Sequence, residues 1–92
     1  LKCLNIRRLI SVIRQRREFP SEKSYTSKLL SNQKLSIEKV KEEVAELIEA
    51  IEKNSNKVHE ASDVLYHLFV LLEANDIKIE DVMDELKKRK KK

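Results

Sequence analysis

The chain has 92 residues, a net charge of +4, no glycine, one proline and one cysteine, Cys3. A chain this short forms one small domain, here expected to cover residues 1–92, and its abundant Leu, Lys and Glu with so few turn residues argue against a sandwich or barrel of short strands. One cysteine excludes an intramolecular disulfide and no apolar run reaches the ~20 residues of a membrane span, so we expect a cytoplasmic protein with no membrane partner.

The first expected element is a helix over residues 3–17, in which Leu4, Leu9, Ile10 and Ile13 recur at helical spacing. Pro20 ends this pattern, because proline disfavours helical backbone in the residue before it. The composition of residues 20–26 is typical of a loop. A short helix over about residues 26–30 is expected to follow.

Two long helices come next. Ser36 is the expected N-cap of a helix that runs to about Lys53, with apolar residues at every third or fourth position. The sequence Asn-Ser-Asn at residues 54–56 breaks the chain before a second helix over about residues 57–74. So short a break requires the two helices to be antiparallel neighbours. The sequence therefore predicts an all-α bundle of about four to five helices, with two long antiparallel helices at its core.

The last elements are a break at Asn75 and Asp76, a short helix over about residues 80–89, and a basic tail. The tail, residues 87–92, consists of six lysines and arginines and is expected to be frayed. Consecutive basic side chains attract nucleic acid without sequence preference. The chain contains no recognised motif for reading bases, and we expect no nucleic-acid partner.

Residues 64–72 of the second long helix are apolar nearly all the way round. A helix without a polar face in a soluble protein is buried on all sides. A chain of 92 residues has too few other helices to cover it. We therefore expect a homodimer built around this segment.

Acidic residues form two stripes at helical spacing. Lys39, Glu43 and Glu46 lie on one side of the first long helix, and Glu60, Asp63 and His67 lie on one side of the second. Antiparallel packing can bring the stripes together, and Mg²⁺ would offset the cost of clustering four carboxylates. The alternatives are a solvated glutamate-rich face for the first stripe and a favourable charge–dipole interaction for acids that open the second helix.

Three segments together resemble a known family. They are Ser-Tyr-Thr-Ser-Lys-Leu at residues 24–29, Lys-Val-Lys-Glu-Glu-Val-Ala-Glu at 39–46 and Glu-Ala-Ser-Asp-Val-Leu-Tyr-His-Leu-Phe-Val-Leu-Leu at 60–72. Their order and spacing are similar to those of phosphoribosyl-ATP pyrophosphatases. That family belongs to the all-α NTP pyrophosphatase (MazG-like) superfamily, whose mark is Glu-x-x-Glu followed by Glu-x-x-Asp. The resemblance extends from about residue 9 to residue 86.

The resemblance implies roles for individual residues. Metal ligands would be Glu43, Glu46, Glu60 and Asp63, and Glu42, Glu43 and Glu46 would form the catalytic set. Glu42 could position water or form a salt bridge. Contacts to the phosphates or sugars of the substrate would come from Ser24, Tyr25, Thr26, Lys28 and Lys39. His67 could orient a ligand or a bound water, or it could be a hydrogen-bonded core histidine, and Tyr66 is expected to be a core or dimer contact.

The implied reaction is the hydrolysis of phosphoribosyl-ATP to phosphoribosyl-AMP and pyrophosphate, the second step of histidine biosynthesis, with one or two Mg²⁺ or Mn²⁺ ions per site. Phosphoryl transfer needs charge neutralisation, to which Arg14, Arg16 or Arg17 could contribute. These arginines equally suit the C-terminal turn of a helix. A MazG-like house-cleaning nucleotide pyrophosphatase and a non-enzymatic helical interaction module are the alternative functions.

Overall fold

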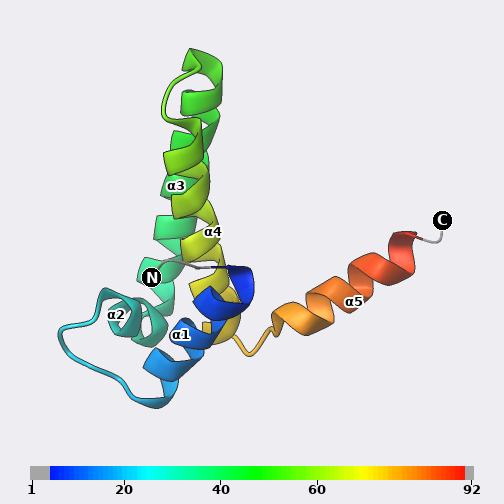
Figure 1. Ribbon diagram of the computed structural model, residues 1–92. Helices are drawn as coiled ribbons and strands as arrows, with labels where there is room; N and C mark the ends of the chain where they lie inside the picture. Colours follow the sequence, from blue (N-terminus) through cyan, green and yellow to red (C-terminus); the bar gives the residue numbers. More distant parts are fainter. Residues whose placement is uncertain (1–4, 91–92) are drawn as a thin grey trace.

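The computed structural model describes residues 5–90, which form five helices and no strand. The helices are α1 (Ile6–Glu18), α2 (Tyr25–Ser31), α3 (Gln33–Lys53), α4 (Lys57–Ala74) and α5 (Ile79–Lys90). Figure 1 shows α3 and α4 as a long antiparallel hairpin, with α1 and α2 gathered near one end of it. The predicted all-α fold with two long antiparallel helices is confirmed.

The predicted helix boundaries hold except at two N-termini. The first helix begins at Ile6, where the side chain of Asn5 caps it by accepting a hydrogen bond from the Arg8 N–H; the predicted start at residues 3 and 4 lies outside the described residues. The expectation that Ser36 caps the first long helix is wrong. Asn32 is the cap of α3, and its Oδ1 accepts from the Leu35 N–H at 3.0 Å. Asn caps as well as Ser does.

Three residues in the breaks adopt left-handed backbone without glycine. Asn54 and Asn56, which flank the α3–α4 turn, have φ of 53° and 56°, and Asp76 after α4 has φ of 58°. Asn and Asp visit this region more readily than other residues with a side chain, because their short polar groups can bond locally. The turns at 54–56 and 75–76 therefore form in a chain that has no glycine.

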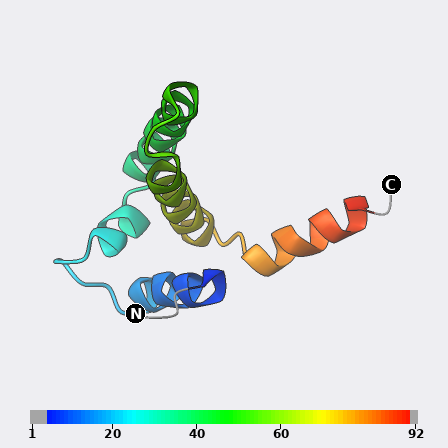
Figure 2. The same cartoon turned by 45° about the horizontal axis from the view of Figure 1, so that its top comes forward.

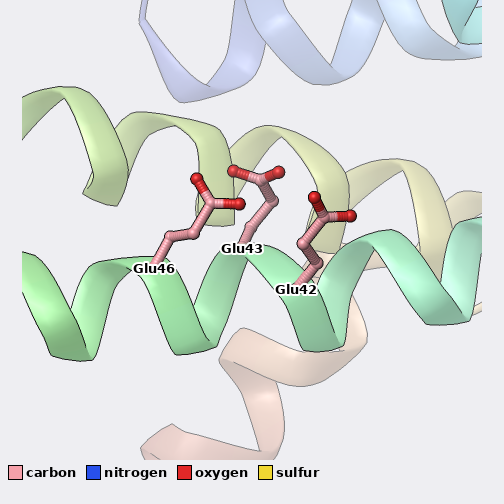
Figure 3. Close-up of side chains that lie close together, drawn as sticks. All are labelled: Glu42, Glu43 and Glu46. Atoms are coloured by element: carbon pink, nitrogen blue, oxygen red, sulfur yellow. The ribbon is translucent and has the colours of Figure 1, made fainter.

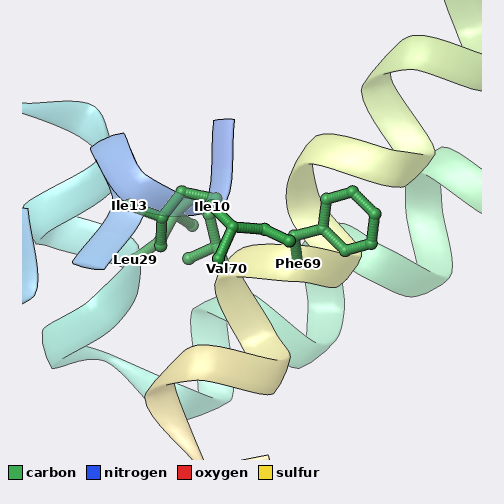
Figure 4. Packing of buried hydrophobic residues seen from close by; sticks show 5 residues of the cluster. All are labelled: Ile10, Ile13, Leu29, Phe69 and Val70. Carbon is green, nitrogen blue, oxygen red and sulfur yellow. The ribbon is translucent and has the colours of Figure 1, made fainter. Parts of the chain in front are cut away.

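The hydrophobic core lies where α1, α2 and α4 meet. Its buried side chains are Ile10, Ile13, Leu29, Phe69 and Val70, which Figure 4 shows converging from these three helices. α1 and α2 cover the C-terminal half of α4, so part of the apolar segment 64–72 is buried within one chain. α3 packs along α4 as the other long arm of the hairpin (Figure 1).

α5 projects away from the other helices in both views (Figures 1 and 2). Ion pairs hold its base: Arg14 on α1 bonds Glu73 and Glu80, and Arg17 bonds Asp76. Arg14 and Arg17 are therefore engaged by α4, the α4–α5 break and α5, and a contribution of Arg14, Arg16 or Arg17 to a substrate site stays a prediction. α5 continues to Lys90, so the predicted frayed tail is helical up to that residue, and residues 91 and 92 lie outside the described part. No helix between residues 5 and 90 has the length and apolar character needed to cross a membrane.

Candidate metal and nucleotide site

Three glutamates of α3 present their carboxylates to one place. Glu42, Glu43 and Glu46 each have a carboxylate oxygen within 4.8 Å of the others. Figure 3 shows the three side chains leaving α3 on the same side, with Glu43 between the other two. Glu43 is buried, at 6% exposure, because it lies at the contact with α4, whereas Glu42 and Glu46 are exposed.

A second group joins α3 to α4. Glu43 also lies within 4.8 Å of carboxylate oxygens of Glu60 and Asp63, which are both half-buried near the start of α4. Glu43 is therefore common to both groups. The structure brings together Glu42, Glu43, Glu46, Glu60 and Asp63, the five acidic residues that the sequence analysis places in the site.

The carboxylates repel one another. The pKa of Glu46 is raised, first by the negative charge of Glu43, then by partial burial and by Glu60 and Glu42. Lys39 offsets part of this charge, since its Nζ lies 3.2 Å from Glu42 and 3.6 Å from Glu43. The hydrogen bond to Glu42 is the main cause of a raised Lys39 pKa.

This group of residues suits a hard divalent cation. All of its donors are carboxylate oxygens, the ligands that Mg²⁺ and Mn²⁺ prefer. One buried oxygen, Glu60 Oε1, has no hydrogen-bond partner among the described residues. An unsatisfied buried carboxylate oxygen is costly unless a cation or a water bonds it. A polar pocket beside the group is lined by residues that include Glu46, Lys53 and Glu60.

Among the predicted substrate contacts at α2, some side chains already form hydrogen bonds within the protein, whereas others are exposed. The Ser24 hydroxyl caps α2 by accepting from the Ser27 N–H, so one of its lone pairs is already used. Lys28 is exposed and forms no ion pair with any residue between 5 and 90. Thr26 bonds the Tyr66 hydroxyl, and the Tyr25 hydroxyl lies 3.0 Å from His67 Nε2. Tyr25 is nonetheless close enough to Lys39 and Glu43 for their charges to act on its pKa.

An aromatic cluster joins α2 to α4 beside the carboxylates. The Tyr25 and Tyr66 rings stack with centroids 6.3 Å apart, and the His67 ring meets the Tyr66 ring edge-on at 5.0 Å. The sequence predicts either an orienting role or a structural hydrogen bond for His67, and a core or dimer contact for Tyr66. The hydrogen bonds of these residues join positions about forty apart in the sequence, which no helical periodicity reveals.

The chain matches the family model of phosphoribosyl-ATP pyrophosphohydrolases over residues 6–90. Histidine biosynthesis bifunctional protein HisIE of Pyrococcus furiosus is 44% identical over 94% of this chain, which spans 41% of that longer protein. Phosphoribosyl-ATP pyrophosphatases of Methanococcoides burtonii and Dechloromonas aromatica are 41% and 45% identical; the matches cover 89% and 91% of this chain and 88% and 81% of those proteins. Both the match over residues 6–90 and these identities show that the chain belongs to the phosphoribosyl-ATP pyrophosphohydrolase family, a family of hydrolases.

Proposed function

We propose that this chain hydrolyses phosphoribosyl-ATP to phosphoribosyl-AMP and pyrophosphate by Mg²⁺-assisted attack of water at the α–β phosphoanhydride. Family membership supports the substrate and the reaction. The observation that carries the chemistry is the position of Glu43, which is buried and shared by two groups of carboxylates from α3 and α4. A cytoplasmic location fits the single cysteine, which suits a reducing compartment.

The proposed metal ligands are Glu43, Glu46, Glu60 and Asp63. A bound Mg²⁺ supplies charge neutralisation for phosphate oxygens and a lowered pKa for a coordinated water. Glu42 lies in the same group of α3 carboxylates but is held by Lys39, so we assign it to positioning water at the edge of the site. The second group alone, Glu43 with Glu60 and Asp63, could hold one ion, and the first group offers room for another.

The proposed substrate contacts lie on α2 and at the start of the acidic stripe. Lys39 pairs with Glu42 and Glu43, and a cation held by Glu43 would weaken that pairing and leave the Lys39 ammonium available to a phosphate. Lys28 is exposed on α2 and can reach solvent-borne phosphate groups without breaking an ion pair. Ser24, Tyr25 and Thr26 precede it and offer hydroxyl groups for the sugars.

A homodimer is part of this proposal. Val44, Ile48 and Ile51 form one apolar stripe along α3 and are exposed, at 38%, 52% and 57%. On α4, Val58 and Leu65 lie two turns apart on one face and are exposed as well. A row of exposed aliphatic side chains at helical spacing on a hairpin is typical of a helix-bundle interface. A second copy that packs on α3 and α4 would cover this face next to the carboxylates.

The test is release of pyrophosphate from phosphoribosyl-ATP by the purified protein, with Mg²⁺ and with a chelator. We expect activity only with the metal, and a loss of at least about 100-fold in Glu43→Gln and in Asp63→Asn, because loss of a ligand should cost no less than loss of a group that only orients one. Glu52→Gln is the matched control, since Glu52 is an exposed glutamate of the same helix outside both groups of carboxylates.

Two results would replace the proposal. Faster hydrolysis of ordinary or modified nucleoside triphosphates than of phosphoribosyl-ATP would favour a house-cleaning pyrophosphatase. Absence of Mg²⁺ binding, with unchanged stability in the double variant Glu43→Gln/Asp63→Asn, would favour a non-enzymatic helical module. The sequence match to enzymes named for phosphoribosyl-ATP supports the first choice over both.

A further inference from the structure

The hydrogen bonds of His67 determine which of its ring nitrogens carries the proton. His67 Nδ1 lies 2.8 Å from the main-chain carbonyl oxygen of Asp63, and a carbonyl oxygen can only accept a hydrogen bond. Nδ1 must therefore be the N–H of the imidazole. In the neutral ring Nε2 is then an acceptor, and the Tyr25 hydroxyl, 3.0 Å away, donates a hydrogen bond to it.

The phenol of Tyr25 has one O–H group, and that O–H donates its hydrogen bond to His67. The Tyr25 oxygen keeps lone pairs that can only accept, and its side chain is exposed at 45% beside the proposed site. We propose that His67 is a positioning residue that makes the Tyr25 hydroxyl an acceptor-only group, so that Tyr25 receives a hydrogen bond from an O–H donor and does not bind a phosphate oxygen. This inference rests on the proposed function, because the O–H donor belongs to the nucleotide or to a water at the metal site.

Three further observations support an ordered, protonated phenol. A tyrosine phenol keeps its proton at neutral pH, and burial, the main cause, raises the pKa of Tyr25 further. The ring of Tyr66 stacks on Tyr25 and meets His67 edge-on, which restricts both partners. The hydrogen bond between Thr26 and Tyr66 is a second polar link between α2 and α4 at the same contact.

The acceptor-only state selects among the groups of a nucleotide. Ionised phosphate oxygens carry no proton to donate, so they would meet the Tyr25 lone pairs without a hydrogen bond. A sugar hydroxyl, or a water molecule at the metal site, can donate. Tyr25 therefore accepts a hydrogen bond from a sugar hydroxyl or from a water at the metal site. Lys39, Lys28 and the metal bind the phosphates.

Nitrogen NMR tests the tautomer without any activity measurement. In the ¹⁵N-labelled protein at mildly alkaline pH, we expect Nδ1 of His67 to resonate as a protonated nitrogen and Nε2 as an unprotonated one. The other histidine, His59, is exposed, and its Nε2 lies 3.4 Å from Asp63 Oδ2, so we expect the opposite tautomer there, with Nε2 protonated, as an internal contrast. Protonation of Nε2 in place of Nδ1 would overturn the assignment. This result does not depend on hydrolysis of phosphoribosyl-ATP, so it separates failure of the inference from failure of the proposed function.

Two substitutions of His67 test the positioning role. The amide oxygen of Gln can reach the place of Nε2 and accept from Tyr25, whereas the shorter Asn reaches only the place of Nδ1. We expect His67→Gln to keep KM and kcat near those of the wild type. His67→Asn should lower kcat/KM by about 2- to 10-fold, the range for one lost neutral hydrogen bond. Equal effects of Gln and Asn would show a role in packing alone.

Tyr25→Phe identifies the donor and remains informative if His67 variants fold poorly. A rise in KM of about 2- to 10-fold at unchanged kcat indicates a sugar hydroxyl. A higher half-saturating Mg²⁺ concentration indicates a water at the metal site. Inhibition by pyrophosphate, which has only phosphate oxygens, should be unchanged at saturating Mg²⁺. Weaker inhibition by pyrophosphate, or no effect of Tyr25→Phe on KM, kcat and the metal requirement, would overturn the inference.

Discussion

Glu43 is the residue on which the carboxylate site is centred, because it is the only one of the described acids that belongs to both groups. Its burial at the α3–α4 contact places a negative charge where water is scarce. The ammonium of Lys39 offsets part of this charge. The remaining repulsion from Glu43 raises the pKa of Glu46. Net negative charge therefore remains in this group, which supports the proposed cation site.

Substitution of Glu46 separates catalysis from stability. Glu46→Gln removes a proposed metal ligand and relieves repulsion from Glu43 and Glu60, which raise its pKa. We expect turnover to fall by at least about 100-fold, while the melting temperature of the metal-free protein stays the same or rises. Thermal unfolding followed by circular dichroism, with and without Mg²⁺, measures this. A clearly lower melting temperature without metal would mean that Glu46 forms a stabilising ion pair.

At the scale of elements, α5 is attached to the other helices by contacts at its N-terminal end. The Arg14 guanidinium donates to both carboxylate oxygens of Glu80, at 2.8 and 3.2 Å, and also to Glu73 on α4. This bidentate hydrogen bond lowers the pKa of Glu80 to about 2. α5 projects from the bundle (Figure 2), and its base is joined to the other helices by this contact, by the Arg17–Asp76 pair and by Ile79, which packs against the core.

The lowered pKa of Glu80 predicts that the Arg14–Glu80 contact, which attaches α5, is weakened by acid. A carboxylate with a depressed folded-state pKa contributes stability above its unfolded pKa of about 4.3, and this contribution is lost as the pH falls towards 2. Glu80→Gln should remove this part of the pH dependence and make α5 amides exchange about two- to fivefold faster at neutral pH, as for one exposed ion pair. Hydrogen exchange read by mass spectrometry gives the measurement.

Glu85→Gln is the control for this prediction, since Glu85 pairs with Arg89 inside α5 and does not connect the helix to α1. Equal exchange rates in the Glu80 and Glu85 variants would show that the Arg14 contact does not anchor α5. A change confined to the Glu80 variant would show that the base of the helix is held electrostatically.

At the scale of the whole molecule, the core of one chain is small and lies to one side. The five apolar residues of the core cluster gather at one end of the hairpin (Figure 4). Toward the other end, α3 and α4 expose aliphatic side chains. A short chain buries a smaller share of its surface than a long one, so association with a second copy would add stability. The exposed stripe of Val44, Ile48 and Ile51 is the surface that we propose for this association.

Ile48→Glu tests the dimer. A charge in the middle of the α3 stripe would be desolvated at the interface without a partner, at a cost of several kcal/mol. We expect the wild type to sediment as a dimer of 10.9 kDa chains and the variant as a monomer with a lower melting temperature. Lys34→Glu, at an exposed polar position of the same helix, should remain dimeric. A monomeric wild type at micromolar concentration would contradict the prediction.

Helix periodicity and break residues determined most of the fold from the sequence alone. The spacing of apolar residues places α3 and α4, and the Asn-Ser-Asn break makes them antiparallel, because both signals act over a few neighbouring residues. The same periodicity put Glu43 and Glu46 on one side of a helix and Glu60 and Asp63 on one side of the next. Their meeting follows from the hairpin, so the carboxylate group could be expected before the structure was known.

Only the tertiary structure decided the contacts that join distant parts of the chain. Asn32 and Ser36 are both good helix caps, and the fold buries Ser36 at 1% exposure and leaves the capping role to Asn32. Arg14 bonds Glu80 across 66 positions, and Tyr25 meets His67 across 42. Such pairs depend on how whole helices pack, and the periodicity within one helix does not predict that packing. For that reason the sequence located the acids, whereas only the fold brought the Tyr25 hydroxyl to His67 and Arg14 to Glu80 at the base of α5.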